Sequence, residues 1–190
     1  MKTTLTFTAI LMLLLSASPA GAQEAFERTL TLQGMTFRLQ CDNTATLNSL
    51  TLTPSGLEID NSPVTLEVDG IVTGAEIADL NADGYPEVYV YVTSAGSGSY
   101  GSLAAWSANN RKSISMIHLP DLAEDPEHGQ GYMGHDKFTI AEQYVVRSFP
   151  VYREDDANAA PSGGTRQIQY RLEPGEATWQ LVVSGSLEFE

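Results

Sequence analysis

The chain has 190 residues, enough for one domain with a sizeable core, and its 42% hydrophobic and 18% charged residues argue against disorder. Ten lysines and arginines stand against 24 aspartates and glutamates, which gives a formal net charge of -14. A chain this acidic is repelled by nucleic acid and by anionic membrane surfaces, so we expect neither as a partner and favour a basic protein instead.

The first 22 residues have the parts of a secretory signal peptide. Lys2 gives a positive start, residues 9–15 form an uncharged apolar run, and Ala20-Gly21-Ala22 is a cleavage site of small residues. The apolar run is shorter than the ~20 residues that a membrane helix needs, and no later segment is long enough either. We therefore expect export to the periplasm and a soluble protein formed by residues 23–190.

Only one cysteine, Cys41, follows the predicted cleavage site, so no internal disulfide can form. It ends a strand-like segment, where an unpaired thiol usually behaves as a small hydrophobic side chain. We expect a structural role, and the stability of the protein must then come from its core.

Short segments rich in β-branched and aromatic residues recur between turn residues along the whole chain. This pattern is typical of an all-β, antiparallel sandwich or flattened barrel, and no break in composition divides residues 23–190 into more than one domain. Residues 88–92 are apolar or aromatic on both faces, so we expect them at the centre of a sheet that is covered on each side. The predicted strands are residues 27–32, 35–41, 49–53, 64–68, 71–78, 87–94, 100–107, 113–119, 138–141, 144–151, 166–172 and 178–183.

Turn residues predict how some of these strands are joined. Tight hairpins are expected at Asp69-Gly70, at Asn109-Asn110 and at residues 173–176, because asparagine and glycine accept the positive φ that such turns require. Residues 121–136 and 155–164 are polar and contain glycine or proline, which predicts long loops. Within the first of them, residues 121–128 have the length for one helical turn.

One segment has the opening of a calcium-binding loop. Asp79, Asn81 and Asp83 alternate ahead of a glycine, as in D-x-N-x-D-G loops, and the acidic Glu87 stands at the ninth position. An EF-hand is excluded because its twelfth residue would be Val90 and a strand follows. Two interpretations stay open: a bound Ca²⁺, or a turn whose carboxylates accept backbone N–H groups.

A second segment of small residues, 96–101, directly follows the predicted central strand. It fits G-x-G-x-x-G on paper, but the helix that a dinucleotide fold needs does not follow. The serine-hydrolase pattern G-x-S-x-G also fails, because Ser97 stands where the first glycine is required. What remains is a loop that presents hydroxyl groups at the end of a rigid strand, a common place for binding residues.

Together, Ser97-Gly98-Ser99-Tyr100 and three neighbouring segments resemble the periplasmic inhibitors of invertebrate-type (i-type) lysozyme. The neighbouring segments are residues 79–93, 107–112 and 131–136. The resemblance covers nearly all of residues 23–190 and implies a non-enzymatic protein that needs no cofactor.

The resemblance also implies which residues bind the partner. In that family a loop of this type enters the lysozyme cleft, which maps onto Ser97, Gly98, Ser99 and Tyr100. A related family that inhibits c-type lysozyme adds a basic residue about fourteen positions later, where this chain has Arg111. If the strand after the loop is straight, at ~3.3 Å per residue, Arg111 lies on the order of 20 Å or more from it. It would then be a rim contact or belong to the second subunit of a homodimer.

The sequence thus predicts an inhibitor of i-type lysozyme. A calcium-dependent binding or adhesion module built on residues 79–87 is the alternative from another class, and a periplasmic glycan hydrolase is a third.

Overall fold

The structure is a computed structural model that describes residues 24–190, so the predicted signal peptide lies outside the described residues. All twelve predicted segments form β-strands, most of them within two residues of the predicted bounds. The strands are β1 (Phe26–Leu32), β2 (Met35–Cys41), β3 (Leu47–Ser55), β4 (Val64–Asp69), β5 (Ile71–Ala78), β6 (Glu87–Thr93), β7 (Gly101–Asn109), β8 (Ser113–Met116), β9 (Lys137–Ala141), β10 (Tyr144–Pro150), β11 (Thr165–Pro174) and β12 (Trp179–Phe189).

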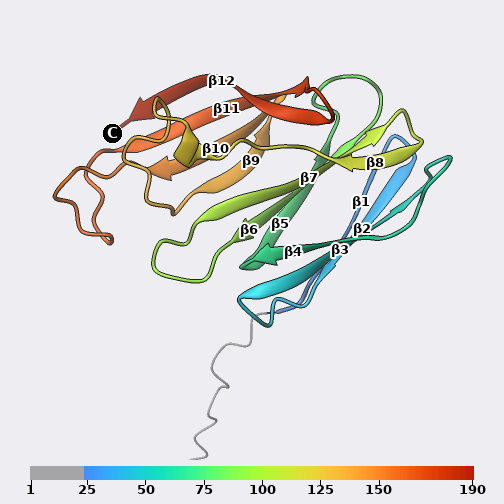
Figure 1. The fold of residues 1–190 in the computed structure, drawn as a ribbon, viewed down its shortest axis with the longest axis horizontal. Coiled ribbons are helices and arrows are strands. Elements are labelled where there is room, and N and C mark those ends of the chain that lie inside the picture. The colour runs from blue at the N-terminus through green and yellow to red at the C-terminus, as the bar shows by residue number, and fades with distance from the viewer. Residues whose placement is uncertain (1–23) are drawn as a thin grey trace, which may run out of the picture.

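The strands form three antiparallel, four-stranded sheets stacked in layers (Figure 1). The first sheet has the order β1-β2-β3-β4, the central sheet β5-β6-β7-β8, and the third sheet β12-β11-β10-β9. One hydrophobic core joins the first sheet to the central sheet, and a second joins the central sheet to the third. The predicted all-β class and sandwich packing are confirmed. Within residues 24–190 no sheet closes on itself, so the barrel form is not adopted.

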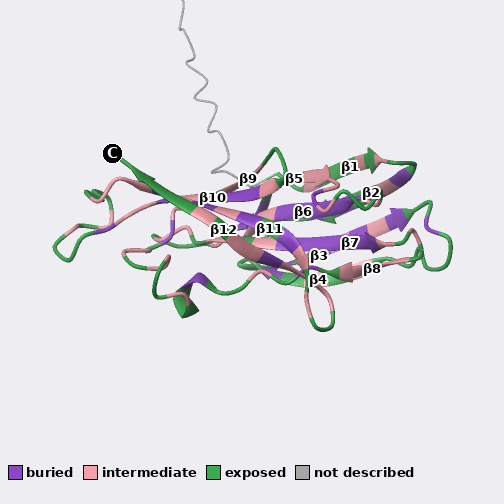
Figure 2. Ribbon diagram, turned by 90° about the horizontal axis from the view of Figure 1, so that it is seen from above, coloured by how far each residue is buried: buried purple, intermediate pink, exposed green. Residues whose placement is uncertain are grey.

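Strand β6 lies between both cores, as its sequence predicts. Val88, Val90 and Val92 point into the core shared with the first sheet, while the alternating Tyr89 points into the core shared with the third. Successive side chains of a strand point to opposite faces, so only a strand without polar positions can sit between two cores. Figure 2 shows β6 and β7 buried over most of their length.

The predicted hairpin at Asp69-Gly70 is wrong. Strand β4 pairs with β3, whereas β5 pairs with β6, so this join carries the chain from the first sheet to the central one. Gly70 has φ +117°, and a Cβ there would lie 2.2 Å from the carbonyl oxygen of Thr93. The glycine therefore serves a crossing between layers, and local turn chemistry does not distinguish this from a hairpin.

The other predicted joins are confirmed. Asn109-Asn110 connects β7 to β8, and β11 and β12 are joined by a turn that lies two residues later than predicted, at 175–178; both pairs are antiparallel hairpins. Residues 121–136 and 155–164 are loops, and the first contains a single 3₁₀ turn, Leu122–Glu124. Cys41 is a free, buried thiol in the core between the first two sheets. No helix in the described residues is long and apolar enough to cross a membrane.

Candidate functional site

The loop of Ser97, Gly98, Ser99 and Tyr100 projects from the end of the central sheet, between β6 and β7. The pairing of Thr93 with Gly101 closes its base. Two further hydrogen bonds tighten this closure: the Ser94 N–H donates to the carbonyl of Tyr100 over 2.8 Å, and the Tyr100 N–H donates to the Ser94 hydroxyl over 3.0 Å. The loop is therefore an extension of the sheet edge and not a free segment.

The polar side chains of this loop face solvent. Ser97 is exposed, and Tyr100 is 49% exposed although its ring is large and mostly apolar. Within residues 24–190 neither hydroxyl makes a hydrogen bond, whereas the Ser99 hydroxyl donates to the carbonyl of Gly96 over 3.4 Å. Ser97 and Tyr100 thus keep unused donors, and Ser99 shapes the loop with φ +42°.

A second loop, residues 131–136, packs against the first. The His135 N–H donates to the Gly98 carbonyl over 2.8 Å, and the rings of Tyr100 and Tyr132 meet edge to face with their centres 5.7 Å apart. Gly134 has φ +89°, and a Cβ there would lie 2.1 Å from the Gly98 carbonyl oxygen. Residues 97–100 and 131–136, which both contribute to the family resemblance in the sequence, are therefore in direct contact.

Asp136 ties both loops to the third sheet. Its carboxylate accepts hydrogen bonds from the N–H of Gly101, from the hydroxyl of Tyr132 at 3.0 Å and from Nε of Arg147 at 2.6 Å. The side chains of Asp136 and Arg147 are 0% and 6% exposed. Burial alone would lower the pKa of Arg147, but the attraction and hydrogen bond of Asp136, together with the nearby Tyr132 and Tyr170, raise that pKa overall. The pair is a buried ion pair that fixes where β7 begins.

A third loop adds one contact that sequence reasoning missed. The side-chain amide of Asn158 donates to the Ser97 carbonyl over 2.9 Å, and the hydroxyl of Tyr152 holds the Asn158 carbonyl over the same distance. Asn158 lies 61 positions from Ser97 in a polar loop, so no pattern in the sequence links them.

Arg111 lies away from this loop. Strand β7 separates the two, and its nine residues at ~3.3 Å each span roughly 30 Å. The guanidinium donates to the carbonyl oxygens of Gly56 at 3.0 Å and Gly34 at 3.4 Å, both in turns of the first sheet. Arg111 therefore links the central sheet to the first sheet and does not lie near Ser97 and Tyr100.

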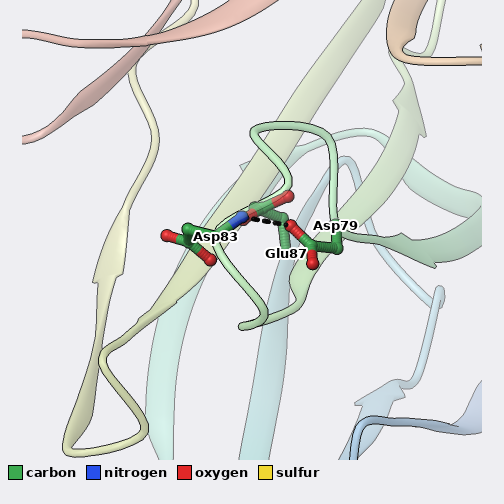
Figure 3. Close-up of side chains that lie close together, drawn as sticks. All are labelled: Asp79, Asp83 and Glu87. Carbon is green, nitrogen blue, oxygen red and sulfur yellow. Dashed lines mark hydrogen bonds between the residues drawn. The ribbon is translucent and has the colours of Figure 1, made fainter.

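The acidic residues of the predicted calcium loop do come together. Asp79, Asp83 and Glu87 each place a carboxylate oxygen within 4.8 Å of the others, at the end of β6 that is remote from Ser97 (Figure 3). Asn81 belongs to the same turn, where its side-chain amide donates to Asp83 over 2.9 Å. Backbone N–H groups of Asp83 and Gly84 donate to Asp79, as the alternative interpretation of a polar turn also expects.

Glu87 differs from the other acidic residues because it is fully buried. One of its carboxylate oxygens accepts the N–H of Leu80 over 2.8 Å, and the other, Oε1, has no partner. Burial raises the pKa of Glu87 to about 8; repulsion from the two aspartates adds to this rise, and the Leu80 N–H and the neighbouring Tyr89 hydroxyl oppose it. This carboxyl group thus lies beneath Asp83, which is exposed, and Asp79, which is half-buried.

Gly134 gives a direct test of the contact between the two loops. We expect Gly134→Ala to weaken partner binding by about tenfold or more, because the new methyl group must displace the Gly98 carbonyl and with it the exposed loop. Gly84→Ala is the matched control, since Gly84 has a similar φ of +85° but nothing within 4 Å of its Cβ position. Equal losses in the two variants, measured as binding at matched folded fractions, would show that the contact is irrelevant.

Fold and site define a layered β-sheet protein that presents a neutral, hydroxyl-bearing loop, braced by two neighbouring loops, at one end of its central sheet. Residues 61–128 match the family model of PliI, described as periplasmic lysozyme inhibitor of I-type lysozyme. No curated protein matches the chain, and no solved structure does.

The matched segment covers a little over a third of the chain. It runs from just before β4 into the loop after β8 and so includes the central sheet, the acidic turn and Ser97 to Tyr100. The resemblance seen in the sequence is confirmed over this segment. The match supports a periplasmic inhibitor of i-type lysozyme, and since the family is one of inhibitors, it supports a function without catalysis.

Proposed function

We propose that this protein inhibits i-type lysozyme by inserting the loop of Ser97, Gly98, Ser99 and Tyr100 into the active-site cleft of the enzyme. The observation that carries the proposal is the state of two side chains: Ser97 and Tyr100 are exposed, and their hydroxyls have no hydrogen-bond partner in the described part of the chain. The family match to residues 61–128, which contain this loop, supports it.

The chemistry of the loop suits such a target. Lysozymes cleave glycan with two carboxyl groups, one protonated and one ionised. Hydroxyl groups donate to a carboxylate and also accept from a carboxylic acid, so Ser97 and Tyr100 can satisfy both states without adding a charge. Gly98 leaves room beside the Tyr100 ring, since a Cβ at Gly98 would lie 2.4 Å from it. The Tyr100 ring can therefore pack against the backbone of Gly98, which keeps the cross-section of the loop small.

The braces around the loop favour tight binding. Hydrogen bonds from His135 and Asn158 hold the carbonyls of Gly98 and Ser97, so little backbone freedom remains to be lost on binding. Ordering a free loop would offset part of the binding energy, and a loop that is already ordered avoids that loss. The net charge of -14 would further speed the encounter with a basic lysozyme.

Two further predictions, on Arg111 and on other classes of partner, remain proposals. Arg111 would contact lysozyme only at the rim of the interface or from the second subunit of a homodimer, because its own loop is roughly 30 Å away along β7. From the acidic composition we also propose that neither nucleic acid nor a membrane surface is a partner.

Cell-wall lysis tests the function directly. The protein is mixed with i-, c- and g-type lysozymes, and lysis of bacterial cell walls is followed with increasing inhibitor. We expect the i-type enzyme to be inhibited at near-stoichiometric ratios and the g-type enzyme to stay active. Undiminished i-type activity at a large excess of the protein would overturn the proposal. Peptidoglycan turnover by the protein alone would instead favour the hydrolase.

A further inference from the structure

We propose that the turn formed by residues 79–87 binds one Ca²⁺ ion, which stabilises the central sheet at the end opposite the inhibitory loop. The site would use the carboxylates of Asp79, Asp83 and Glu87 and the side-chain oxygen of Asn81. This inference does not depend on the proposed inhibition, since the two sites lie at opposite ends of β6.

The buried carboxyl of Glu87 is the observation that points to an ion. Oxygen Oε1 of Glu87 is completely buried and has no partner in hydrogen-bonding geometry, and the hydroxyl of Tyr89, two residues further along β6, is also buried and unpaired. Glu87 is one of three carboxyl groups that each place an oxygen within 4.8 Å of the others (Figure 3). A buried polar atom without a partner is rare in folded proteins because its desolvation is not repaid. A cation held against Asp79 and Asp83 would supply the missing partner.

No positively charged side chain of the described residues neutralises this acidic cluster. Within residues 24–190 no lysine, arginine or histidine forms an ion pair with Asp79, Asp83 or Glu87. The donors that reach the two aspartates are neutral: backbone N–H groups and the side-chain amides of Asn81 and Gln33, the latter 2.7 Å from Asp79. Clustered carboxyl groups without a positive neighbour attract a divalent cation, and such an ion would favour the ionised form of the buried Glu87.

The donor set selects calcium among the common ions. All of the side-chain donors are oxygens, which suits Ca²⁺ or Mg²⁺ and not zinc. Calcium accepts six to eight oxygens with flexible geometry, and in loops of this spacing the backbone carbonyl of the seventh residue, here Tyr85, also contributes. Magnesium demands a regular octahedron and keeps several waters, so a turn with this many protein oxygens favours calcium.

The place of the site assigns the ion a structural role. Glu87 begins β6 and pairs with Ala78, the last residue of β5, so an ion would clamp the join of the two strands. Asp79 also bonds to Gln33 in the β1–β2 turn, which connects the clamp to the first sheet. Ca²⁺ should therefore raise the melting temperature of the protein and leave inhibition at room temperature unchanged.

Calorimetry and thermal unfolding test the proposal. The EDTA-treated full chain is titrated with Ca²⁺ and, separately, with Mg²⁺, and its melting temperature is measured in both ions. We expect one calcium site of about 0.1–1 mM, as in extracellular calcium modules, with weaker binding of magnesium. In 10 mM Ca²⁺ the melting temperature should rise by roughly 5 °C. No heat and no shift at this concentration would overturn the proposal.

Matched variants localise the effect. Glu87→Gln keeps the shape of the side chain but removes the charge, and Asp83→Asn does the same at an exposed position where folding is not at risk. Both should abolish the calcium-induced shift. Glu67→Gln, an exposed change of equal charge on β4, should keep it. If Glu87→Gln and Asp83→Asn melt with the same calcium shift as the wild type, the ion binds elsewhere and the assignment is wrong.

Discussion

Replacing Ser97 and Tyr100 together by alanine is expected to weaken inhibition of an i-type lysozyme by 100-fold or more. Exposed aromatic side chains that enter a partner's pocket commonly contribute about 2 kcal/mol or more each, which is roughly a 30-fold effect before the serine is counted. The Tyr100 side chain is 49% exposed and has an unbonded hydroxyl, so both its ring and its O–H would be lost from the interface. The inhibition constant from a cell-wall lysis assay is the measurement.

Two further variants separate the parts of this effect. Tyr100→Phe keeps the ring and removes only the hydroxyl, so it should weaken inhibition by about tenfold. Phe189→Ala removes another large aromatic side chain of similar exposure, 51%, from the end of β12 and should leave inhibition unchanged. The mechanism fails if the double variant inhibits as well as Phe189→Ala while both melt at the wild-type temperature.

Most of the fold follows from local pattern. Within each sheet every strand pairs only with its neighbours in sequence, so the alternation of apolar residues and the turn residues predict most of the topology. The pattern of residues 88–92 even predicts that β6 is covered on both faces. Local pattern fails at Asp69-Gly70, where the same turn residues carry the chain from one sheet to another. Two consecutive strands either pair in one sheet or lie in different sheets, depending on which core their apolar faces fill. A tight turn is compatible with either arrangement.

The site could be predicted only in part for a related reason. Ser97 to Tyr100 stand out because small and hydroxyl residues interrupt the pattern after a buried strand. The residues that hold this loop in place, Asn158 and Asp136, are ordinary polar residues of long loops and lie 61 and 35 positions from their partners. Arg111 shows the reverse case: its distance in sequence matched a known pattern, but β7 separates it from the loop. Spacing along a chain predicts proximity only within one turn or one strand.

Asp136→Ala is expected to lower the free energy of unfolding by about 3–5 kcal/mol, the largest stability loss among the changes considered. The substitution leaves the buried guanidinium of Arg147 without its counter-charge, and it removes the acceptor of the Gly101 N–H and of the Tyr132 hydroxyl. Because the free energy of unfolding of a folded domain is only about 5–15 kcal/mol, this one change would remove a large part of it. Urea unfolding followed by circular dichroism gives the difference.

Comparison with other substitutions identifies the cause of this loss. Glu27→Ala breaks an exposed ion pair with Arg38 and should change the free energy of unfolding by less than about 1 kcal/mol. Asp136→Asn combined with Arg147→Met removes both buried charges and should be less destabilising than Asp136→Ala, because no lone charge stays in the core. If Asp136→Ala unfolds at the same urea concentration as Glu27→Ala, Asp136 does not anchor the loop. If it is destabilised as expected, samples kept below the unfolding transition should also inhibit lysozyme more weakly, since Gly101, where the loop joins β7, has then lost its anchor.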